Sequence, residues 1–207
     1  MKVLLFNGSC HAGGCTFTAL SEIAKTLNAA GIETEILQIG SAPVRDCIGC
    51  GGCRGKNRCV FDDDLVNEWI EKAKAADGFV FGTPVYYAHP AGRILSVMDR
   101  MFYAAGAYFA HKPAAAVASA RRGGTTASLD AMNKYFGITQ MPVVSSTYWN
   151  MVHGNEPADV LKDLEGLQTM RNIGTNMAWL LYCIESGKRA GIEVPVAERG
   201  ARTNFIR

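Results

Sequence analysis

The sequence predicts an α/β fold: a doubly wound sheet of five parallel strands with helices on both faces. Short apolar runs alternate with segments whose apolar residues recur at helical spacing. The first three runs end in or are followed by Asn or Gly, as buried parallel strands commonly do. The chain has 207 residues, of which 48% are hydrophobic, so it can bury a sizeable core. We expect residues 1–207 to form one domain.

Five apolar runs are predicted to be strands because each is short and bounded by turn residues. In chain order they cover residues 3–6, 34–39, 78–82, 114–119 and 142–146. The fourth run is weak because it is rich in alanine, which has a low strand propensity. Alternation of these strands with helices places all five parallel to one another, with right-handed crossovers.

Helices are predicted between the strands, where apolar residues return every three or four positions. The first has Leu20, Ile23 and Leu27 on one face and is followed by Gly31, a typical C-terminal cap. Acidic residues 62–64 offer an N-cap for the second. The helices cover residues 16–30, 62–75, 91–103, 127–136 and 157–187, the last as one long helix or a broken pair. With the aperiodic tail 190–207, this last part makes residues 157–207 a C-terminal extension.

Charge and composition exclude several function classes. Lys plus Arg number 21 and Asp plus Glu number 19, a net charge of +2, so the chain lacks the basic surface that nucleic acids or anionic membranes attract. No window approaches the roughly 18 apolar residues of a membrane span, and the first residues lack a signal peptide's long apolar region. We expect a cytoplasmic protein with no nucleic-acid or membrane partner.

Residues 7–18, NGSCHAGGCTFT, join the first strand to a helix N-terminus. Free backbone N–H groups and the helix dipole favour an anion there. The spacing fits neither a P-loop nor the G-x-G-x-x-G dinucleotide loop, and it does not fit a C-x5-R phosphatase loop. A phosphate site with neutral donors remains, suited to a phosphate that is kept rather than transferred. A plain glycine-rich turn is the alternative.

The loop after the third strand, GTPVYYAHPAG, covers residues 82–92. Ligands of open α/β sheets bind outside the carboxyl ends of the strands, where this loop lies. Pro84 stiffens the turn, and Tyr86 and Tyr87 offer flat surfaces to a planar ligand. The alternative is an ordinary buried aromatic pair.

Four of the seven cysteines form the motif CIGCGGCRGKNRC, residues 47–59. An odd cysteine count in a chain without a signal peptide argues against a disulfide framework. Thiolates at such short spacing can surround an iron–sulfur cluster. A zinc site, a C-x-x-C redox pair and inert thiols are the alternatives. The predicted metal ligands are Cys47, Cys50, Cys53 and Cys59. Outside the motif, Cys183 is expected in the core.

These motifs resemble those of a known family. The loop GSCHAGGCT is similar to the GSPRxxGNT loop that binds the FMN phosphate in flavodoxin-like NAD(P)H-dependent FMN reductases, with Cys10, His11 and Cys15 replacing Pro, Arg and Asn. GTPVYY resembles their GSPVYW segment beside the flavin ring. ILSVMDRMF resembles their helix with a DR pair, here Asp99 and Arg100, which we interpret as structural. The cysteine motif and the following CVFDDD resemble those of iron-sulfur flavoproteins, which carry a [4Fe-4S] cluster beside FMN.

The resemblance implies a flavodoxin-like fold with strand order 2-1-3-4-5 and an FMN-dependent oxidoreductase. Electrons would pass from NAD(P)H or a reduced carrier to a small acceptor such as a quinone or flavin, with flavin N5 rather than a side chain as the reacting centre. The alternative is an FMN/[4Fe-4S] electron-transfer protein that works with a carrier such as ferredoxin and has no small-molecule substrate of its own. A third reading is a phosphate-binding module with a zinc knuckle.

The same resemblance implies the FMN-binding residues and a homodimer or homotetramer. Arg121 or Arg122 could face the negative charge of a reduced flavin, and two glycines beside them allow close backbone approach. A solvated arginine is the alternative. The residue 148–154 segment YWNMVHG is expected to add an aromatic rim. The expected FMN-binding residues are Ser9, His11, Gly14, Cys15, Thr16, Phe17, Pro84, Val85, Tyr86, Tyr87, Ser119, Arg121, Gly123 and Gly124.

Overall fold

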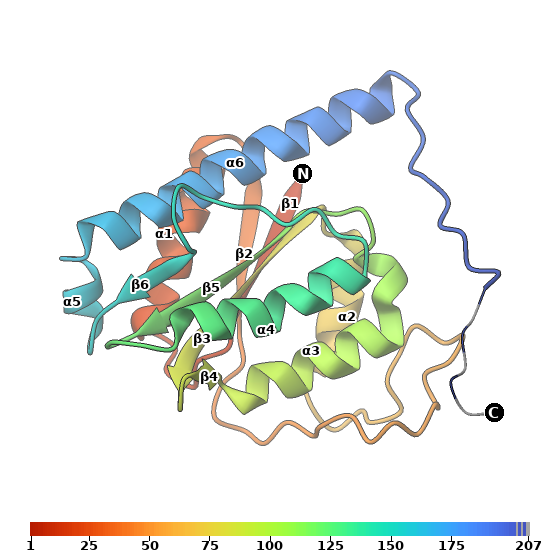
Figure 1. Ribbon diagram of the computed structural model, residues 1–207, viewed down its shortest axis with the longest axis horizontal. Coiled ribbons are helices and arrows are strands. Elements are labelled where there is room, and N and C mark those ends of the chain that lie inside the picture. The colour runs from red at the N-terminus through yellow and green to blue at the C-terminus, as the bar shows by residue number, and fades with distance from the viewer. Residues whose placement is uncertain (202, 204, 206–207) are drawn as a thin grey trace.

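A central parallel sheet lies between two layers of helices (Figure 1). The computed structural model describes residues 1–201, 203 and 205; the other positions of the predicted tail lie outside the described residues. The strands, in sheet order, are β2 (Glu33–Gln38), β1 (Lys2–Asn7), β3 (Gly78–Tyr86), β5 (Ala114–Ala120) and β6 (Met151–His153). A short β4 (His89–Pro90) pairs antiparallel with β3. The order of the five parallel strands confirms the predicted 2-1-3-4-5 arrangement.

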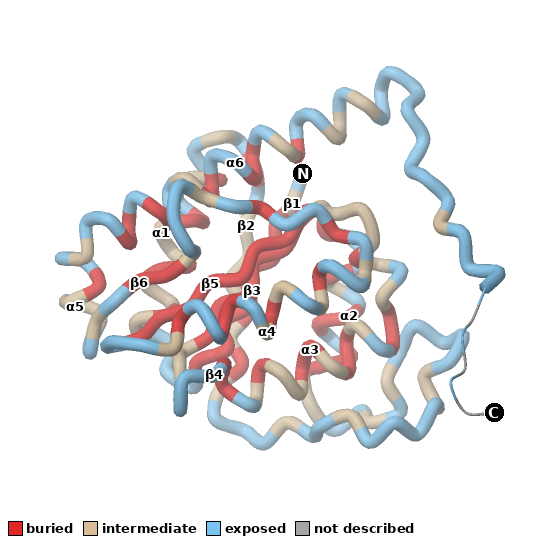
Figure 2. The backbone as a smooth tube through the Cα atoms, viewed as in Figure 1, coloured by how far each residue is buried: buried red, intermediate tan, exposed pale blue. Residues whose placement is uncertain are grey.

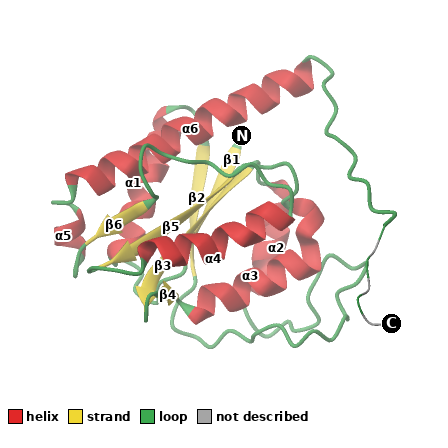
Figure 3. Ribbon diagram, in the orientation of Figure 1, coloured by secondary structure: helices red, strands yellow, loops and turns green. Residues whose placement is uncertain are grey.

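The helices divide between the two faces of the sheet (Figures 1 and 3). One face is covered by α1 (Cys15–Ala29) and α6 (Leu164–Arg189), and the other by α2 (Val66–Ala75), α3 (Gly92–Ala105) and α4 (Thr125–Ile138). The C-terminal region forms two helices rather than one long helix. The first, α5 (Pro157–Val160), is a single turn. The second, α6, begins after Asp163, whose carboxylate caps it by accepting the Gly166 N–H at 2.9 Å. A single 3-10 turn, η1 (Gly106–Tyr108), follows α3. Through residue 201, every helix is too short or too polar to cross a membrane.

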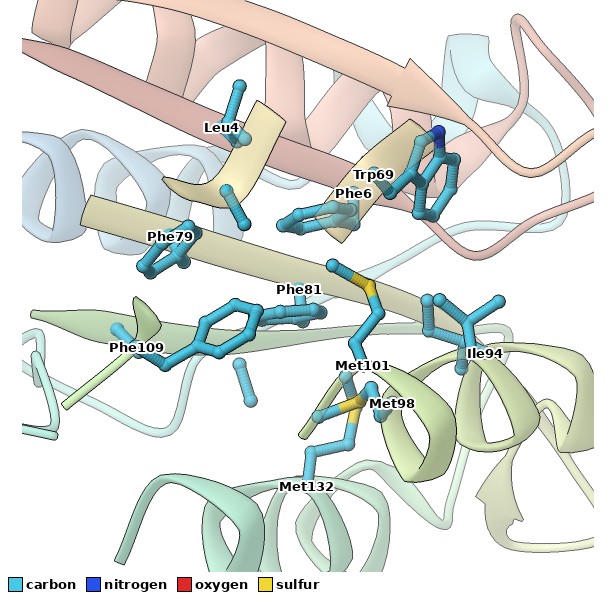
Figure 4. Close-up of a cluster of buried hydrophobic side chains, with 14 of the residues drawn as sticks. Leu4, Phe6, Trp69, Phe79, Phe81, Ile94, Met98, Met101, Phe109 and Met132 are labelled. Atoms are coloured by element: carbon cyan, nitrogen blue, oxygen red, sulfur yellow. The ribbon is translucent and has the colours of Figure 1, made fainter. Parts of the chain in front are cut away.

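The core has two parts because side chains alternate across each strand. In β1, Val3 and Leu5 pack toward α1 and α6, whereas Leu4 and Phe6 pack toward α2 and α3. Figure 4 shows the second part, where aromatic rings from β1, β3 and α2 meet methionines of α3 and α4. Strands β1, β3 and β5 are buried along most of their length, whereas the edge strand β2 has only Leu37 buried (Figure 2). β5 contributes mostly alanines, and these small side chains let the flanking helices approach the sheet.

The fifth strand differs from its prediction at residues 142–146. That segment begins alongside β5, where the Ala114 N–H donates to the Pro142 carbonyl at 2.9 Å and the Val144 N–H to the Ala114 carbonyl at 2.8 Å. The chain then leaves the sheet and returns as β6, in the segment expected to be an aromatic rim. The apolar pattern identified the segment that first contacts β5. It did not reveal the polar segment between that contact and β6, which Asn172 and Asn176 of α6 hold by hydrogen bonds.

The second helix also begins later than predicted. It starts at Val66, and its capping residue Leu65 has no side-chain bond to the helix. The three acidic residues before it instead bind other parts of the chain. Asp62 bonds to Asn67 and Arg58, Asp63 to Arg45, and Asp64 to Arg100 and to the Val66 N–H. The carboxylates therefore fix the preceding loop more than they cap the helix.

Candidate functional site

A cavity of about 660 Å³ opens at the carboxyl edge of the sheet. Loops that follow β1, β3, β5 and β6 form its walls, as the general rule for open parallel sheets requires. Its lining residues are Ser9, His11, Ala12, Gly13, Gly14, Cys15, Thr16, Pro84, Val85, Tyr86, Ser119, Ala120, Arg121, Gly154, Asn155, Glu156 and Pro157. Segments far apart in the chain thus meet at one concave site large enough for a cofactor.

The loop after β1, residues 7–18 (the phosphate loop), starts with a close backbone contact. The Gly8 N–H donates to the Gly82 carbonyl at 2.8 Å. A Cβ on Gly8 would lie 2.7 Å from that carbonyl oxygen and 2.7 Å from Cβ of Ile94. Only glycine allows β1, β3 and α3 to come together at this point. The phosphate loop is therefore set by packing beneath it.

Buried polar groups then fold the phosphate loop back on itself. The Asn7 side-chain oxygen accepts the Ser9 N–H at 3.1 Å, and the Ser9 hydroxyl accepts the His11 N–H at 3.1 Å. Gln38, at the end of β2, donates to the Ser9 carbonyl at 2.6 Å. Each of these bonds satisfies a group that would otherwise be partly buried without a partner. These hydrogen bonds within the chain therefore set the shape of the phosphate loop.

Helix α1 presents its N-terminus to the cavity. Its capping residue is Gly14, and no acidic side chain lies in its first turn. The N–H groups of that turn have no partners within the helix and carry the positive end of its dipole. The buried Thr16 hydroxyl lies 2.8 Å from that of Ser119, which ties this turn to the end of β5. The arrangement can bind a phosphate with neutral donors.

The extension of β3, through Pro84, Val85 and Tyr86, forms another wall. β3 continues four residues beyond the predicted strand, to Tyr86, and pairs with His89–Pro90. Gly124, at φ 101°, starts α4 directly against this hairpin, where a Cβ would lie 2.5 Å from Cα of Ala88. Partial burial raises the pKa of Tyr86, so its hydroxyl stays protonated. Tyr87 is fully exposed and does not line the cavity.

The loop after β6 lines the cavity with residues 154–157. Gly154 ends the segment 148–154 that was expected to add an aromatic rim, whereas residues 155–157 were not predicted. The aromatic side chains of that segment, Tyr148 and Trp149, are exposed and do not line the cavity. Gly154 accepts a long hydrogen bond from the Cys15 thiol, at 3.7 Å, and Glu156 adds a carboxylate to the wall. Burial raises the pKa of Cys15, and the carboxylates of Asp159 and Glu156 add to the rise. Cys15 is therefore a neutral donor at neutral pH. The carboxyl-end rule could have found this loop if the fifth strand had been placed correctly.

Most of the residues expected to bind FMN are brought together in this cavity. Those that line it are Ser9, His11, Gly14, Cys15, Thr16, Pro84, Val85, Tyr86, Ser119 and Arg121. Phe17, Tyr87, Gly123 and Gly124 are not lining residues. Phe17 lies in the first turn of α1, and Gly124 supports the hairpin behind the wall.

The cysteine motif forms a second, much smaller pocket of about 20 Å³ (the cysteine pocket). All four cysteines line it, together with Arg100, Tyr103 and Ala104 of α3. Gly49 and Gly51, both with positive φ, bend the loop between the thiols. Within the described part of the chain, no three His, Cys, Asp or Glu side chains are close enough to hold a metal ion. The donor set nevertheless has the composition that iron–sulfur clusters use.

Arg100, expected to be merely structural, enters the cysteine pocket from α3. Its side chain is 1% exposed and forms an ion pair with Asp64, which is 6% exposed. Its Nε–H donates to Sγ of Cys59 at 3.3 Å. Burial alone would lower the pKa of Arg100, but the bonds with Asp64 and Cys59 outweigh it and raise that pKa. Cys183, expected in the core, is instead exposed on the outer side of α6.

Comparison with known proteins identifies the family of the chain. Residues 1–156 match the family described as NADPH-dependent FMN reductase. An iron-sulfur flavoprotein of Methanocaldococcus jannaschii is 32% identical over 89% of this chain and 100% of its own length. An iron-sulfur flavoprotein of Methanosarcina thermophila is 28% identical over 91% of this chain and 99% of its own.

Solved structures show the same fold at low sequence identity. A flavodoxin from the domain Archaea has a TM-score of 0.60 at 15% identity, covering 88% of this chain and 99% of its own. A flavone reductase has a TM-score of 0.66 at 18% identity, covering 89% of this chain and 64% of its own. The chain belongs to the NADPH-dependent FMN reductase family, in its iron-sulfur flavoprotein branch, and has a flavodoxin-like fold.

Proposed function

We propose that this FMN-dependent oxidoreductase passes electrons from NAD(P)H or a reduced carrier to a small acceptor such as a quinone or flavin. The observation that supports it most is the cavity at the N-terminus of α1, whose first turn has no acidic side chain and presents neutral donors, its backbone N–H groups and the Thr16 hydroxyl. Such a site holds a phosphate in place without activating it for transfer. The FMN phosphate would bind the phosphate loop, and the ring would lie along residues 84–86.

Each wall of the cavity would have a defined task. The first turn of α1 and the Thr16 hydroxyl would bind the phosphate. Pro84 and Tyr86 would orient the ring, and Arg121 would offset negative charge on it. Bound FMN supplies hydride and single-electron chemistry, so no side-chain acid or base is required for the transfer itself.

The cysteine motif would hold a [4Fe-4S] cluster through Cys47, Cys50, Cys53 and Cys59. Their convergence on one pocket supports this proposal, as do the relatives named iron-sulfur flavoproteins. The motif loop carries Arg54, Lys56 and Arg58, which would offset the negative charge of the cluster.

We also propose a homodimer or homotetramer, which light scattering of the purified protein would measure.

A second candidate function is electron transfer without a small-molecule substrate. It is favoured by the apolar side chains Ile48, Val60 and Tyr103, which are exposed around the cysteine pocket. Such a surface fits a protein carrier such as ferredoxin better than a buried substrate. The two functions share the FMN site and differ in the electron donor.

Anaerobic purification followed by flavin, iron and sulfide analysis tests the cofactors. We expect FMN, iron and sulfide, and rapid bleaching of the flavin by NADPH or NADH. Bleaching only by reduced ferredoxin would favour the carrier function. Protein that stays colourless after incubation with FMN would contradict both functions.

Cys50→Ser separates the two cofactors. Because Cys50 belongs to the exposed motif loop and does not line the cavity, the variant should lose iron and sulfide and keep FMN. Cys183→Ser, a matched substitution of an exposed cysteine on α6, should keep both. Equal iron in the wild type and in Cys50→Ser would show that the motif is not the ligand set.

A further inference from the structure

We propose that Arg100 is a positioning residue that raises the reduction potential of the iron–sulfur cluster through Cys59. The inference rests on the proposed function, since it requires a cluster on the cysteine motif. It assigns a task in the redox chemistry to a side chain on α3, outside the motif.

Arg100 is held in one orientation by four partners. Its guanidinium pairs with Asp64 and donates to the carbonyls of Phe61 at 3.1 Å and Arg45 at 3.2 Å. The remaining Nε–H points to Sγ of Cys59 at 3.3 Å. These bonds occupy the planar fork of the guanidinium, so the donor to sulfur cannot rotate away. Lysine has no equivalent geometry.

Burial makes this charge effective. Arg100 and Asp64 are 1% and 6% exposed, whereas Arg45 and Asp63, an ion pair in the same loop, are 59% and 56% exposed. Charges in a low-dielectric environment act more strongly than charges in water. A buried N–H donor and a positive charge beside a ligand sulfur favour the more negative, reduced cluster. Removing them should therefore lower its reduction potential.

Asp64 works in the opposite direction. Its carboxylate compensates the charge of Arg100, and its removal leaves every N–H donor of Arg100 in place. Asp64→Asn should consequently raise the potential. A merely structural role of the pair predicts instead that both changes loosen the loop, without opposite shifts.

The test is an anaerobic redox titration with dithionite, followed by electron paramagnetic resonance of the reduced cluster. It compares the wild type, Asp64→Asn and the double variant Arg100→Met with Asp64→Asn, which leaves no buried charge unpaired. The exposed pair in the same loop serves as the matched control, as Arg45→Met with Asp63→Asn. Iron and flavin contents are measured for each protein.

We expect the double variant to be at least about tenfold harder to reduce, a shift of about 59 mV for a one-electron couple. Asp64→Asn should shift in the opposite direction, and the control should change by less than roughly twofold because exposed pairs are screened. Unchanged potentials in both Asp64 variants would overturn the inference.

Two further outcomes are distinguishable. If the double variant holds no iron, the reduction potential of Asp64→Asn is the deciding measurement, because this variant keeps the donor to Cys59. An unchanged or lowered potential in Asp64→Asn would also overturn the inference. Wild-type protein without a cluster would contradict the proposed cluster itself.

Discussion

The phosphate loop and the cysteine loop (residues 40–64) both carry glycines and cysteines, yet the chain holds them in different ways. The phosphate loop rests on a backbone contact at Gly8 and on bonds among Asn7, Ser9 and Gln38. The cysteine loop contains neither helix nor strand and runs along the surface (Figures 2 and 3). A Cβ on Gly49 or Gly51 would meet no atom within 4 Å, although both residues have positive φ, and a Cβ on Gly52 would lie 2.5 Å from the Val60 side chain rather than from backbone.

Each loop is prepared for its ligand in a different way. Packing shapes the phosphate loop before any ligand binds. The cysteine loop depends on side-chain contacts with α2 and α3, mainly those that Asn67 and Arg100 make with the backbone and carboxylates of the loop. A methyl group at Gly8 should therefore damage the phosphate loop, because it would meet backbone, whereas a change of charge state should loosen the cysteine loop.

The largest effect is expected from Gly8→Ala. The added Cβ would lie 2.7 Å from the Gly82 carbonyl oxygen, which is backbone and cannot turn aside. We expect the apoprotein to lose about 2 kcal/mol of unfolding free energy in urea and to bind FMN poorly. Gly13→Ala, in the same loop with open space around it, should stay within about 0.5 kcal/mol. Equal stability of the two variants would mean that packing does not set this loop.

A smaller effect is expected from Thr16→Val. The variant keeps the side-chain shape but removes one partner of the 2.8 Å bond with Ser119, leaving a buried hydroxyl without that bond. We expect a loss of about 1–2 kcal/mol in urea unfolding of the apoprotein. Thr175→Val on α6, whose hydroxyl is exposed, is the control and should change little. If Thr16→Val has the same free energy of unfolding as the wild type, this bond does not stabilise the site.

The smallest effect is the loosening of the cysteine loop at low pH. Asn67 and Arg58 lower the pKa of Asp62, and Arg45 lowers that of Asp63, from an ordinary value of 3.8. Because both values are lowered on folding, their stabilising contribution is complete above about pH 4 and is lost as the pH falls through the lowered values. We expect hydrogen exchange to rise in the cysteine loop before the phosphate loop.

Peptides from both loops, followed by mass spectrometry between about pH 5 and about pH 2.5, would measure this difference. In Asp62→Asn with Asp63→Asn, exchange of the cysteine loop should depend less on pH. If both loops open at the same pH, the acidic residues do not hold the cysteine loop separately from the phosphate loop.

Much of the fold could be predicted because local periodicity reports which residues are buried. The first four strands and their helices followed from apolar runs and helical spacing, and the sheet order followed from the family resemblance. The fifth strand was misplaced because its pairing with β5 is interrupted by a polar excursion held by Asn172 and Asn176. Cys183 was misplaced because the apolar run around it does not reveal which side of α6 faces outward.

The sequence alone determined the phosphate loop, the turn at Pro84 and the clustering of four cysteines, since each depends on residues that are neighbours in the chain. That residues 155–157 complete the cavity, and that Arg100 reaches Cys59, 41 positions away, depends on tertiary packing. The reason is physical: local spacing sets backbone shape. The contacts of a buried charge depend on which distant segments pack around it, and no periodicity in the chain records that.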